Sequence, residues 1–188
     1  MALQSLRGKT MSAVLEEDRL GETIRTIVGN TAKAVETNPN AGRLAFSAKS
    51  ELVKGLKATN KVRKFEFISD EPQSLGGTDE GANPVEYILA ALASCQEIVI
   101  SAYAHALGIA FEKVEVEVKG ELDLRGFFNL ADVRPGFDTI VLNTKVITNE
   151  TDPEKLNQLR HLAKNNCPVL DIIKNPVPVS ESLEFSQR

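Results

Sequence analysis

The feature that most constrains the fold is one long apolar segment, residues 84–108, which opens with Pro84 and closes with Gly108. Proline is favoured in the first turn of a helix and glycine just after its end, so these two residues predict a helix over this range. Nearly every position between them is apolar, and a helix that is apolar on all sides must be covered on all sides. The segment therefore predicts a core helix around which the rest of the chain is built.

The same segment is long enough to cross a lipid bilayer. It carries Gln96, Glu97 and His105, however, and no second segment of the chain resembles it. A glutamate near the centre of a single span is costly in lipid. We therefore interpret the segment as the core helix of a globular protein and expect no membrane association.

Composition and charge narrow the class of protein further. The chain has 188 residues, a net charge of −4 and a pI near 5.4, so it lacks the basic surface of nucleic-acid-binding proteins and we expect no such partner. Two cysteines are too few for a secreted disulfide framework and suit a reducing compartment. Residues 1–20 hold no apolar core segment and turn acidic at Glu16, which argues against a secretory or transit peptide. We expect a cytoplasmic protein.

The chain divides into a short leader region and one main domain. Residues 12–36 have the mixed apolar pattern of a helix, and turn residues follow it. Residues 1–10 precede a second methionine, Met11, and are interpreted as a loose leader. The expected division is residues 1–40 for the leader and helix, and residues 41–188 for the main domain.

The clearest strand signal lies in residues 111–124, where valines and leucines alternate with charged residues. Such alternation indicates a strand with one buried face and one wet face, as in an antiparallel sheet. Residues 137–148 are the expected partner strand. The connection over residues 125–137 is too long for a tight hairpin, and its apolar groups need a surface to cover them. These groups are Phe127, Phe128 and Leu130.

Further strands are predicted at residues 43–60 and 61–69. In the second of these, the alternation places Arg63 on one face with Phe65 and Phe67. A charge on an apolar face either belongs to a functional site or reaches water from the end of its strand. The sequence leaves both interpretations open.

The C-terminal part is predicted to be two helices and an edge strand. Asp152 and Pro153 are typical of a helix start, and a second, short helix is predicted over residues 167–175. Prolines in residues 176–185 suit an extended edge segment. Together these elements predict an α+β fold in which one antiparallel sheet packs against a helical layer.

The two cysteines occupy different local settings. Cys95 lies in the apolar helix, where it is either a small apolar side chain or a reactive thiol. Cys167 directly precedes Pro168 at a helix start, where backbone N–H groups favour a thiolate, so the local sequence predicts a lowered pKa or a capping role. The spacing of the two cysteines and two histidines matches no zinc motif. We expect neither a metal nor a cofactor.

Two motifs carry a resemblance to a known family. The stretch "LGGTDEGANPVEYILAALASC" resembles the first cysteine motif of the OsmC/Ohr family of osmotically induced and organic hydroperoxide resistance proteins. The stretch "NNCPVLDIIKNPVPV" resembles its second cysteine motif, and residues 125–137 resemble an insertion found in one OsmC-like branch. The resemblance covers residues 43–185. It implies an OsmC-like intertwined homodimer, in which antiparallel sheets wrap around long central helices.

The resemblance also implies a thiol peroxidase. In that activity Cys95 would attack an organic hydroperoxide and become a sulfenic acid, Cys167 would resolve it as a disulfide, and a dithiol reductant would reopen the disulfide. In the family's peroxidase branch an arginine and a glutamate assist the attacking thiol, and Arg63 and Glu86 are the candidates for these roles. An apolar substrate pocket is expected around the core helix, lined by Leu89, Leu92 and Val99.

Two other functions remain open on the sequence alone. The protein could be an OsmC-like binding module whose pocket holds a small hydrophobic ligand, with little or no peroxidase activity. Alternatively, Cys95 and Cys167 could form a structural disulfide, which by closing a long loop would contribute about 4 kcal/mol to stability.

Overall fold

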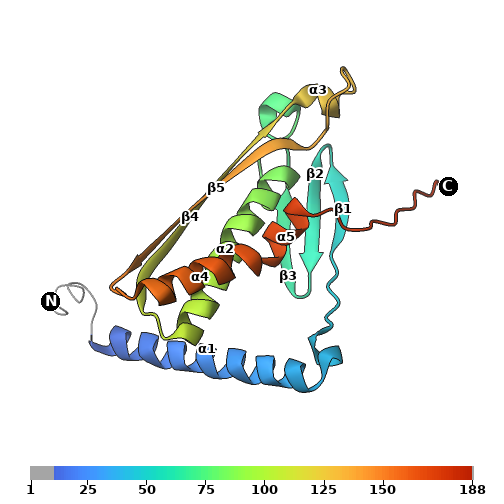
Figure 1. Ribbon diagram of the computed structural model, residues 1–188. Helices are drawn as coiled ribbons and strands as arrows, with labels where there is room; N and C mark the ends of the chain where they lie inside the picture. Colours follow the sequence, from blue (N-terminus) through green and yellow to red (C-terminus); the bar gives the residue numbers. More distant parts are fainter. Residues whose placement is uncertain (1–10, 188) are drawn as a thin grey trace.

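The computed structural model describes residues 11–187, and α2 (Pro84–Leu107) runs through its centre (Figure 1). The helix begins with a capping box: the Asn83 side chain accepts from the Glu86 N–H, and the Glu86 carboxylate accepts from the Asn83 N–H. It ends at Gly108, whose φ of 67° is accessible to glycine at little cost. The predicted core helix and both of its ends are confirmed.

The predicted pair of long strands is also confirmed. Strand β4 (Phe111–Leu122) pairs antiparallel with β5 (Phe137–Thr148), with Val116 opposite Thr144. The connection between them contains a short helix, α3 (Leu124–Phe127), at the far end of the ribbon (Figure 1). The apolar groups of this connection, which were expected to need a covering surface, are exposed within the described residues.

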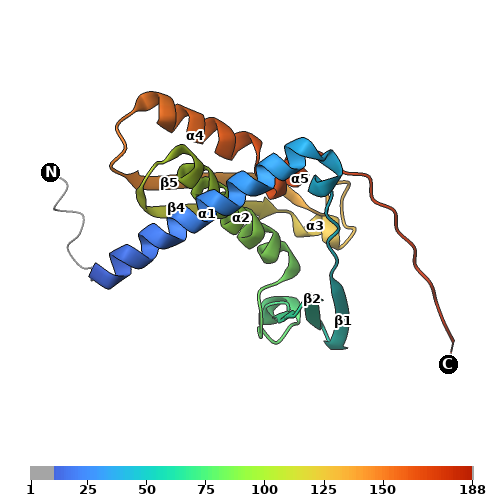
Figure 2. The ribbon, with the colours of Figure 1, turned by 90° about the horizontal axis from the view of Figure 1, so that it is seen from below.

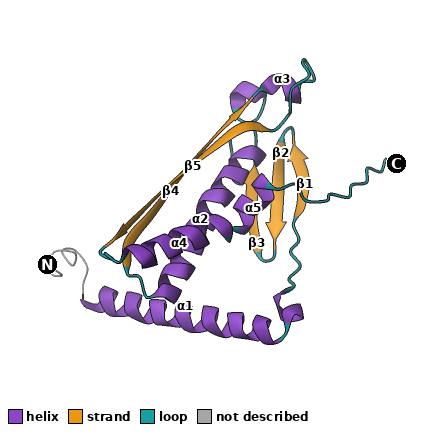
Figure 3. Ribbon diagram, viewed as in Figure 1, coloured by secondary structure: helices purple, strands orange, loops and turns teal. Residues whose placement is uncertain are grey.

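The remaining strands form a separate sheet, which corrects the prediction of a single one. Its order is β1-β2-β3, all antiparallel, and it lies near the N-terminal end of α2 (Figure 3). The predicted strand at 61–69 is interrupted, because Arg63 has a φ of 54° and turns the chain by a two-residue turn. Arg63 therefore does not lie on a strand face. The three strands are β1 (Lys49–Lys54), β2 (Lys57–Val62) and β3 (Phe65–Ser69).

The N-terminal helix α1 (Met11–Thr37) confirms the predicted helix, and a 3₁₀ turn, η1 (Pro39–Gly42), follows it. Seen from below, α1 crosses α2 (Figure 2). The Arg25 guanidinium donates to the backbone carbonyl of His105 at 2.9 Å, which fastens α1 to the C-terminal end of α2. Residues 1–10, interpreted above as a leader, lie outside the described residues.

Two helices complete the fold. Asp152 caps α4 (Pro153–Asn165), and α5 (Pro168–Lys174) follows after a short turn, both as predicted. A further 3₁₀ turn, η2 (Gln73–Leu75), lies between β3 and α2. The predicted edge strand at 176–185 is wrong: after α5 the described chain, up to residue 187, pairs with no strand.

The core is small and lies where α2, α4 and β4 meet. Along α2 the buried residues recur every fourth position, which places them on one face of the helix. The opposite face is open in the single protomer, where Ile98 is 68% exposed. One face of the apolar central helix is therefore buried, and the opposite face is exposed within the described residues. The buried core cluster consists of Ile100, Ala104, Ile109, Leu159 and Ala163.

Candidate active site

The structure brings the two thiols together. Cys95 lies in the middle of α2, Cys167 is the residue that caps α5, and their Sγ atoms are 3.2 Å apart. The packing of α4 on α2 produces this contact, because only a short turn separates the end of α4 from Cys167. The separation exceeds the bond length of about 2.05 Å in a disulfide, so both cysteines are free. The resolving role that the resemblance implies for Cys167 requires the two sulfurs to lie close together, and they do.

Burial distinguishes the two thiols. Cys167 is 2% exposed, whereas Cys95 is half-buried. Burial raises the pKa of the Cys167 thiol, and the backbone N–H groups of Leu170 and Val169 oppose this rise without overcoming it. The lowered pKa predicted for Cys167 from its helix-start position is therefore wrong. Its thiol keeps the proton and donates it towards the Cys95 sulfur.

The other two proposed site residues lie elsewhere in the protomer. Glu86 precedes Cys95 by nine residues, which on an ideal helix is about 13.5 Å along the axis and about 180° around it. Its carboxylate is engaged in the capping box of α2. Arg63 lies in the turn between β2 and β3, with its guanidinium 5.2 Å from the centre of the Phe65 ring. Within residues 11–187 no hydrogen bond or ion pair joins Arg63 or Glu86 to either cysteine.

The thiol pair lies in a segment that matches a known family. A protein-family model described as OsmC-like protein matches residues 77–182, which is more than half of the chain and includes both cysteines. The chain belongs to the OsmC-like family. A comparison with curated protein sequences gave no match.

Solved structures support the OsmC-like fold. An OsmC-like protein from Mycoplasma pneumoniae superimposes with a TM-score of 0.60 at 19% identity, covering 71% of this chain and 89% of that one. A putative osmotic stress induced and detoxification response protein from Psychrobacter arcticus superimposes with a TM-score of 0.56 at 20% identity, covering 71% of this chain and 91% of that one. An organic hydroperoxide resistance protein OsmC from Legionella pneumophila superimposes with a TM-score of 0.52 at 21% identity, covering 70% of this chain and 90% of that one. At these identities the likeness establishes the fold.

The central position of α2 in this fold agrees with its apolar character. By length and composition α2 could cross a membrane, but in this fold it is the central helix against which β4 and α4 pack. Within residues 11–187 no cluster of three or more His, Cys, Asp or Glu side chains is arranged to hold a metal ion.

The described residues of this OsmC-like chain do not form the substrate pocket that was expected around Cys95. Leu92 is fully buried and faces the core, so it cannot line an open pocket. The pockets that border the described parts of α2, α1 and the β4–β5 ribbon have none of Cys95, Leu89 or Val99 among their lining residues. In the single protomer the surface of α2 beside Cys95 is open instead of enclosed.

Sequence reasoning missed a polar site on the buried face of α2. Gln96 is 6% exposed and lies on the same face as the buried Leu92 and Ile100. It contributes to a pocket between α2, α4 and β5, together with Arg160 of α4. The signal that could have found it is the four-residue period of the buried face, which places a glutamine between two aliphatic core positions.

Proposed function

We propose that this OsmC-like protein is a thiol peroxidase that reduces organic hydroperoxides. The observation that carries the proposal is the distance of 3.2 Å between the half-buried Cys95 sulfur and the buried Cys167 sulfur. Family membership supports it, as does the fold likeness to proteins named for organic hydroperoxide resistance. Two free thiols at this distance suit a reaction that makes and breaks a disulfide.

The proposed cycle moves two electrons from the thiols to the peroxide. The Cys95 thiol loses its proton, the thiolate attacks one peroxide oxygen and the O–O bond breaks. The leaving alkoxide takes up a proton, so the products are an alcohol and a sulfenic acid on Cys95. The Cys167 sulfur then attacks the sulfenic sulfur, which forms the disulfide and releases water. An external dithiol supplies two electrons and two protons to restore both thiols.

Burial supports the proposed roles of the two cysteines. The attacking sulfur must meet the peroxide, and Cys95 is the more accessible of the two. The Cys167 thiol, with its raised pKa, remains protonated at neutral pH and donates towards the Cys95 sulfur. Cys167 therefore suits the resolving role, and its attack on the sulfenic acid is coupled to loss of its proton.

A homodimer completes this proposal. The open face of α2 carries Ile88 and Ile98, and the small sheet exposes aromatic and aliphatic side chains on β1 and β3. A second copy that covers these surfaces would enclose Cys95 and form the wall of a pocket for an apolar peroxide. If Arg63 or Glu86 acts on the thiols, it must reach the thiols of the other subunit across this interface.

A reducing cytoplasmic compartment suits a cycle that needs a dithiol.

The test compares three proteins under one set of conditions: wild type, Cys95→Ser and Cys167→Ser. Each is given cumene hydroperoxide with a dithiol, and turnover is followed by peroxide consumption. Cys95→Ser should abolish turnover. Cys167→Ser should react once and accumulate a sulfenic acid that dimedone traps on Cys95, which mass spectrometry locates.

Two results would contradict the assignment. A dimedone adduct on Cys167 in the Cys95→Ser protein, with turnover retained, would reverse the two roles. No adduct in either variant would reject the peroxidase and favour an OsmC-like binding module instead. Hydrogen peroxide is the matched substrate control, because a pocket built for apolar peroxides should favour cumene hydroperoxide.

A further inference from the structure

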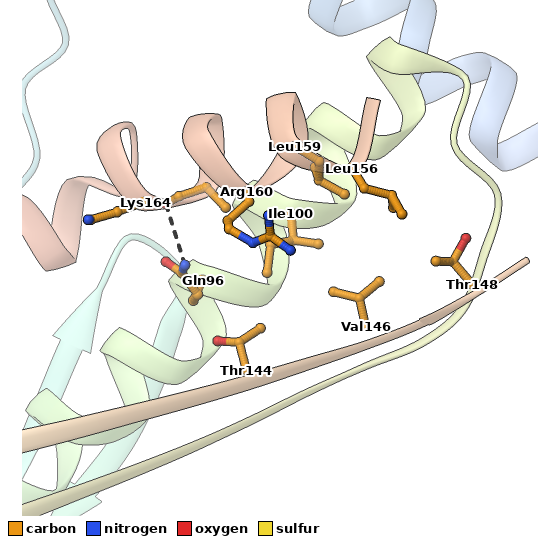
Figure 4. Close-up of a pocket in the computed structure, with 10 residues that line it drawn as sticks. Gln96, Ile100, Thr144, Val146, Thr148, Leu156, Leu159, Arg160 and Lys164 are labelled. Atoms are coloured by element: carbon orange, nitrogen blue, oxygen red, sulfur yellow. Dashed lines mark hydrogen bonds between the residues drawn. The ribbon is translucent and has the colours of Figure 1, made fainter. Parts of the chain in front are cut away.

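A pocket of about 400 Å³ lies between α2, α4 and β5, on the buried side of the central helix (Figure 4). Its floor is the face of β5 that carries Thr144, Val146 and Thr148 at alternate positions. Ile100 and Leu159 close it from the two helices. A volume of this size and a mainly aliphatic wall with a few polar groups are typical of small-molecule sites.

Gln96 is the polar group at one end of this pocket, and its hydrogen bonding is incomplete. Its Nε2 donates to the Ala163 carbonyl at 3.4 Å, near the limit of a hydrogen bond, and its Oε1 is buried without a partner within residues 11–187. A buried amide oxygen that accepts nothing costs about 1–3 kcal/mol. The terminal torsion of a glutamine is broad and easily turned, so the amide can present Oε1 to a donor in the pocket.

The charged side chains that line the pocket are all positive. Arg160 and Lys164 of α4 are lining residues, and no aspartate or glutamate lines the pocket. The Arg160 side chain extends into the space between α4 and β5 (Figure 4). Its guanidinium donates to Asn157, but it forms no ion pair in the described part of the chain. Its remaining N–H groups are available to a carboxylate.

We propose that this pocket binds a small hydroxy carboxylic acid with an aliphatic body. The carboxylate pairs with Arg160 at the cationic side, the body packs against Ile100, Val146 and Leu159, and the hydroxyl donates to Gln96 Oε1. Neither cysteine lines the pocket, although Gln96 is the neighbour of Cys95 in α2, so the proposal places no ligand contact on the two thiols.

The direct test is binding of ω-hydroxyoctanoate to the reduced, full-length protein, measured by calorimetry. The site is located by methyl NMR of Ile100, Val146 and Leu159. Octanoate lacks the hydroxyl and octanol lacks the carboxylate, so each removes one proposed contact. ω-Hydroxyoctanoate should bind about fivefold more tightly than octanoate and about tenfold more tightly than octanol, because a hydrogen bond contributes about 1 kcal/mol and one to a charged group more.

Two variants assign the contacts to residues. Arg160→Gln should weaken ω-hydroxyoctanoate about tenfold and leave octanol unchanged. Lys174→Gln on α5 removes the same charge away from the pocket and should change nothing. Gln96→Leu should make ω-hydroxyoctanoate bind no better than octanoate. Because it replaces an unsatisfied amide by an apolar group of similar size, this variant should fold at least as stably as wild type, which thermal unfolding checks.

Three outcomes would overturn the proposal. Equal affinity for all three probes would show a merely apolar cavity. Methyl shifts that persist in Arg160→Gln with unchanged affinity would remove the carboxylate contact. Absence of any shift at millimolar probe would show that the pocket holds water only. Cys95→Ser should bind the probe as wild type does, and a loss there would show that the two sites are one.

Discussion

At the scale of single residues, Cys167 shows two opposing influences on one thiol. Its place at the start of α5 offers backbone N–H groups, which favour the thiolate, while its burial at 2% exposure favours the neutral thiol. Burial prevails and raises the Cys167 pKa. The helix start opposes this rise through the N–H groups of Leu170 and Val169, but burial outweighs it.

This raised pKa predicts a loss of stability at alkaline pH. Between the unfolded thiol pKa, about 8.5, and the higher folded value, the native state binds more protons than the unfolded state. The contribution of Cys167 to the free energy of unfolding should therefore be fully present below about pH 8.5. It should be lost as the pH rises through the folded pKa. Urea unfolding of the reduced protein from about pH 7 to 10 measures this slope.

Cys167→Ala is the control for this prediction. It removes the titrating thiol, so its free energy of unfolding should fall less steeply over the same pH range, whatever its absolute value. Other groups that titrate at high pH are present in both proteins and cancel in the difference. Parallel curves for the two proteins would show that the buried thiol does not titrate differently in the folded state.

Glu86 raises a second question at the residue scale, whether its carboxylate is structural or catalytic. In the capping box Glu86 Oε2 accepts from the Asn83 N–H at 2.8 Å. Glu86→Gln keeps an acceptor there and should change the free energy of unfolding by less than about 0.5 kcal/mol, whereas Glu86→Ala should cost about 1 kcal/mol. Peroxide turnover should survive in Glu86→Gln. Loss of turnover in a stably folded Glu86→Gln would instead place this carboxylate at the thiols across the dimer.

At the scale of elements, the loop between β3 and α2 determines where the central helix begins. Asp70 is 1% exposed and accepts four hydrogen bonds, from the N–H groups of Glu71, Thr78 and Glu80 and from the Thr78 hydroxyl at 2.6 Å. A Cβ at Gly77 would lie 1.8 Å from the Glu71 carbonyl oxygen, so this tight loop requires glycine. The loop leads directly into the capping box of α2.

Asp70→Asn should destabilise the protein in a pH-dependent way. The Thr78 hydroxyl first, and then the backbone donors, lower the Asp70 pKa, so its contribution is present above the unfolded pKa and is lost as the pH falls through the folded value. The stability difference between wild type and Asp70→Asn should be largest at neutral pH and should shrink below about pH 4. Chemical unfolding across this range measures it, and a difference independent of pH would mean that the charge has no part in the loop.

At the scale of the whole molecule, the described chain leaves several large apolar side chains exposed. Ile98 on α2 is 68% exposed, and Phe127 beyond the β4–β5 ribbon is 70% exposed. The small sheet also exposes apolar side chains on β1 and β3, and one of its few links to the body is the Tyr87 hydroxyl, which donates to the Ile68 carbonyl at 2.6 Å. Apolar surfaces of this extent mark an interface.

We therefore expect a dimer in sedimentation at micromolar concentration. Ile98→Glu places a charge in the centre of the expected interface and should weaken dimerisation by at least tenfold, because an unpaired charge is costly to bury. Ile98→Val is the matched control and should remain dimeric. A folded wild-type monomer at this concentration would contradict the intertwined homodimer.

The sequence by itself determined the elements whose signals are local. Pro84 and Gly108 bounded the central helix, the alternation of residues 111–124 gave the long strand, and Asp152 marked the start of α4. Each of these signals acts through the backbone or through neighbours a few residues away, so one stretch of sequence is enough to read it. The motif around Cys95 likewise indicated the family.

Only the tertiary structure decided what depends on distant packing. The contact between Cys95 and Cys167 joins positions 72 residues apart and follows from the packing of α4 on α2. No local sequence pattern measures burial, and burial raises the pKa of Cys167, which the sequence had predicted to be lowered. The alternation around Arg63 looked like one continuous strand, but the chain turns there and forms two strands, β2 and β3. The pairing of β2 with β3 decides where each of them ends. The Gln96 pocket arises where three elements meet, so no single segment of sequence contains it.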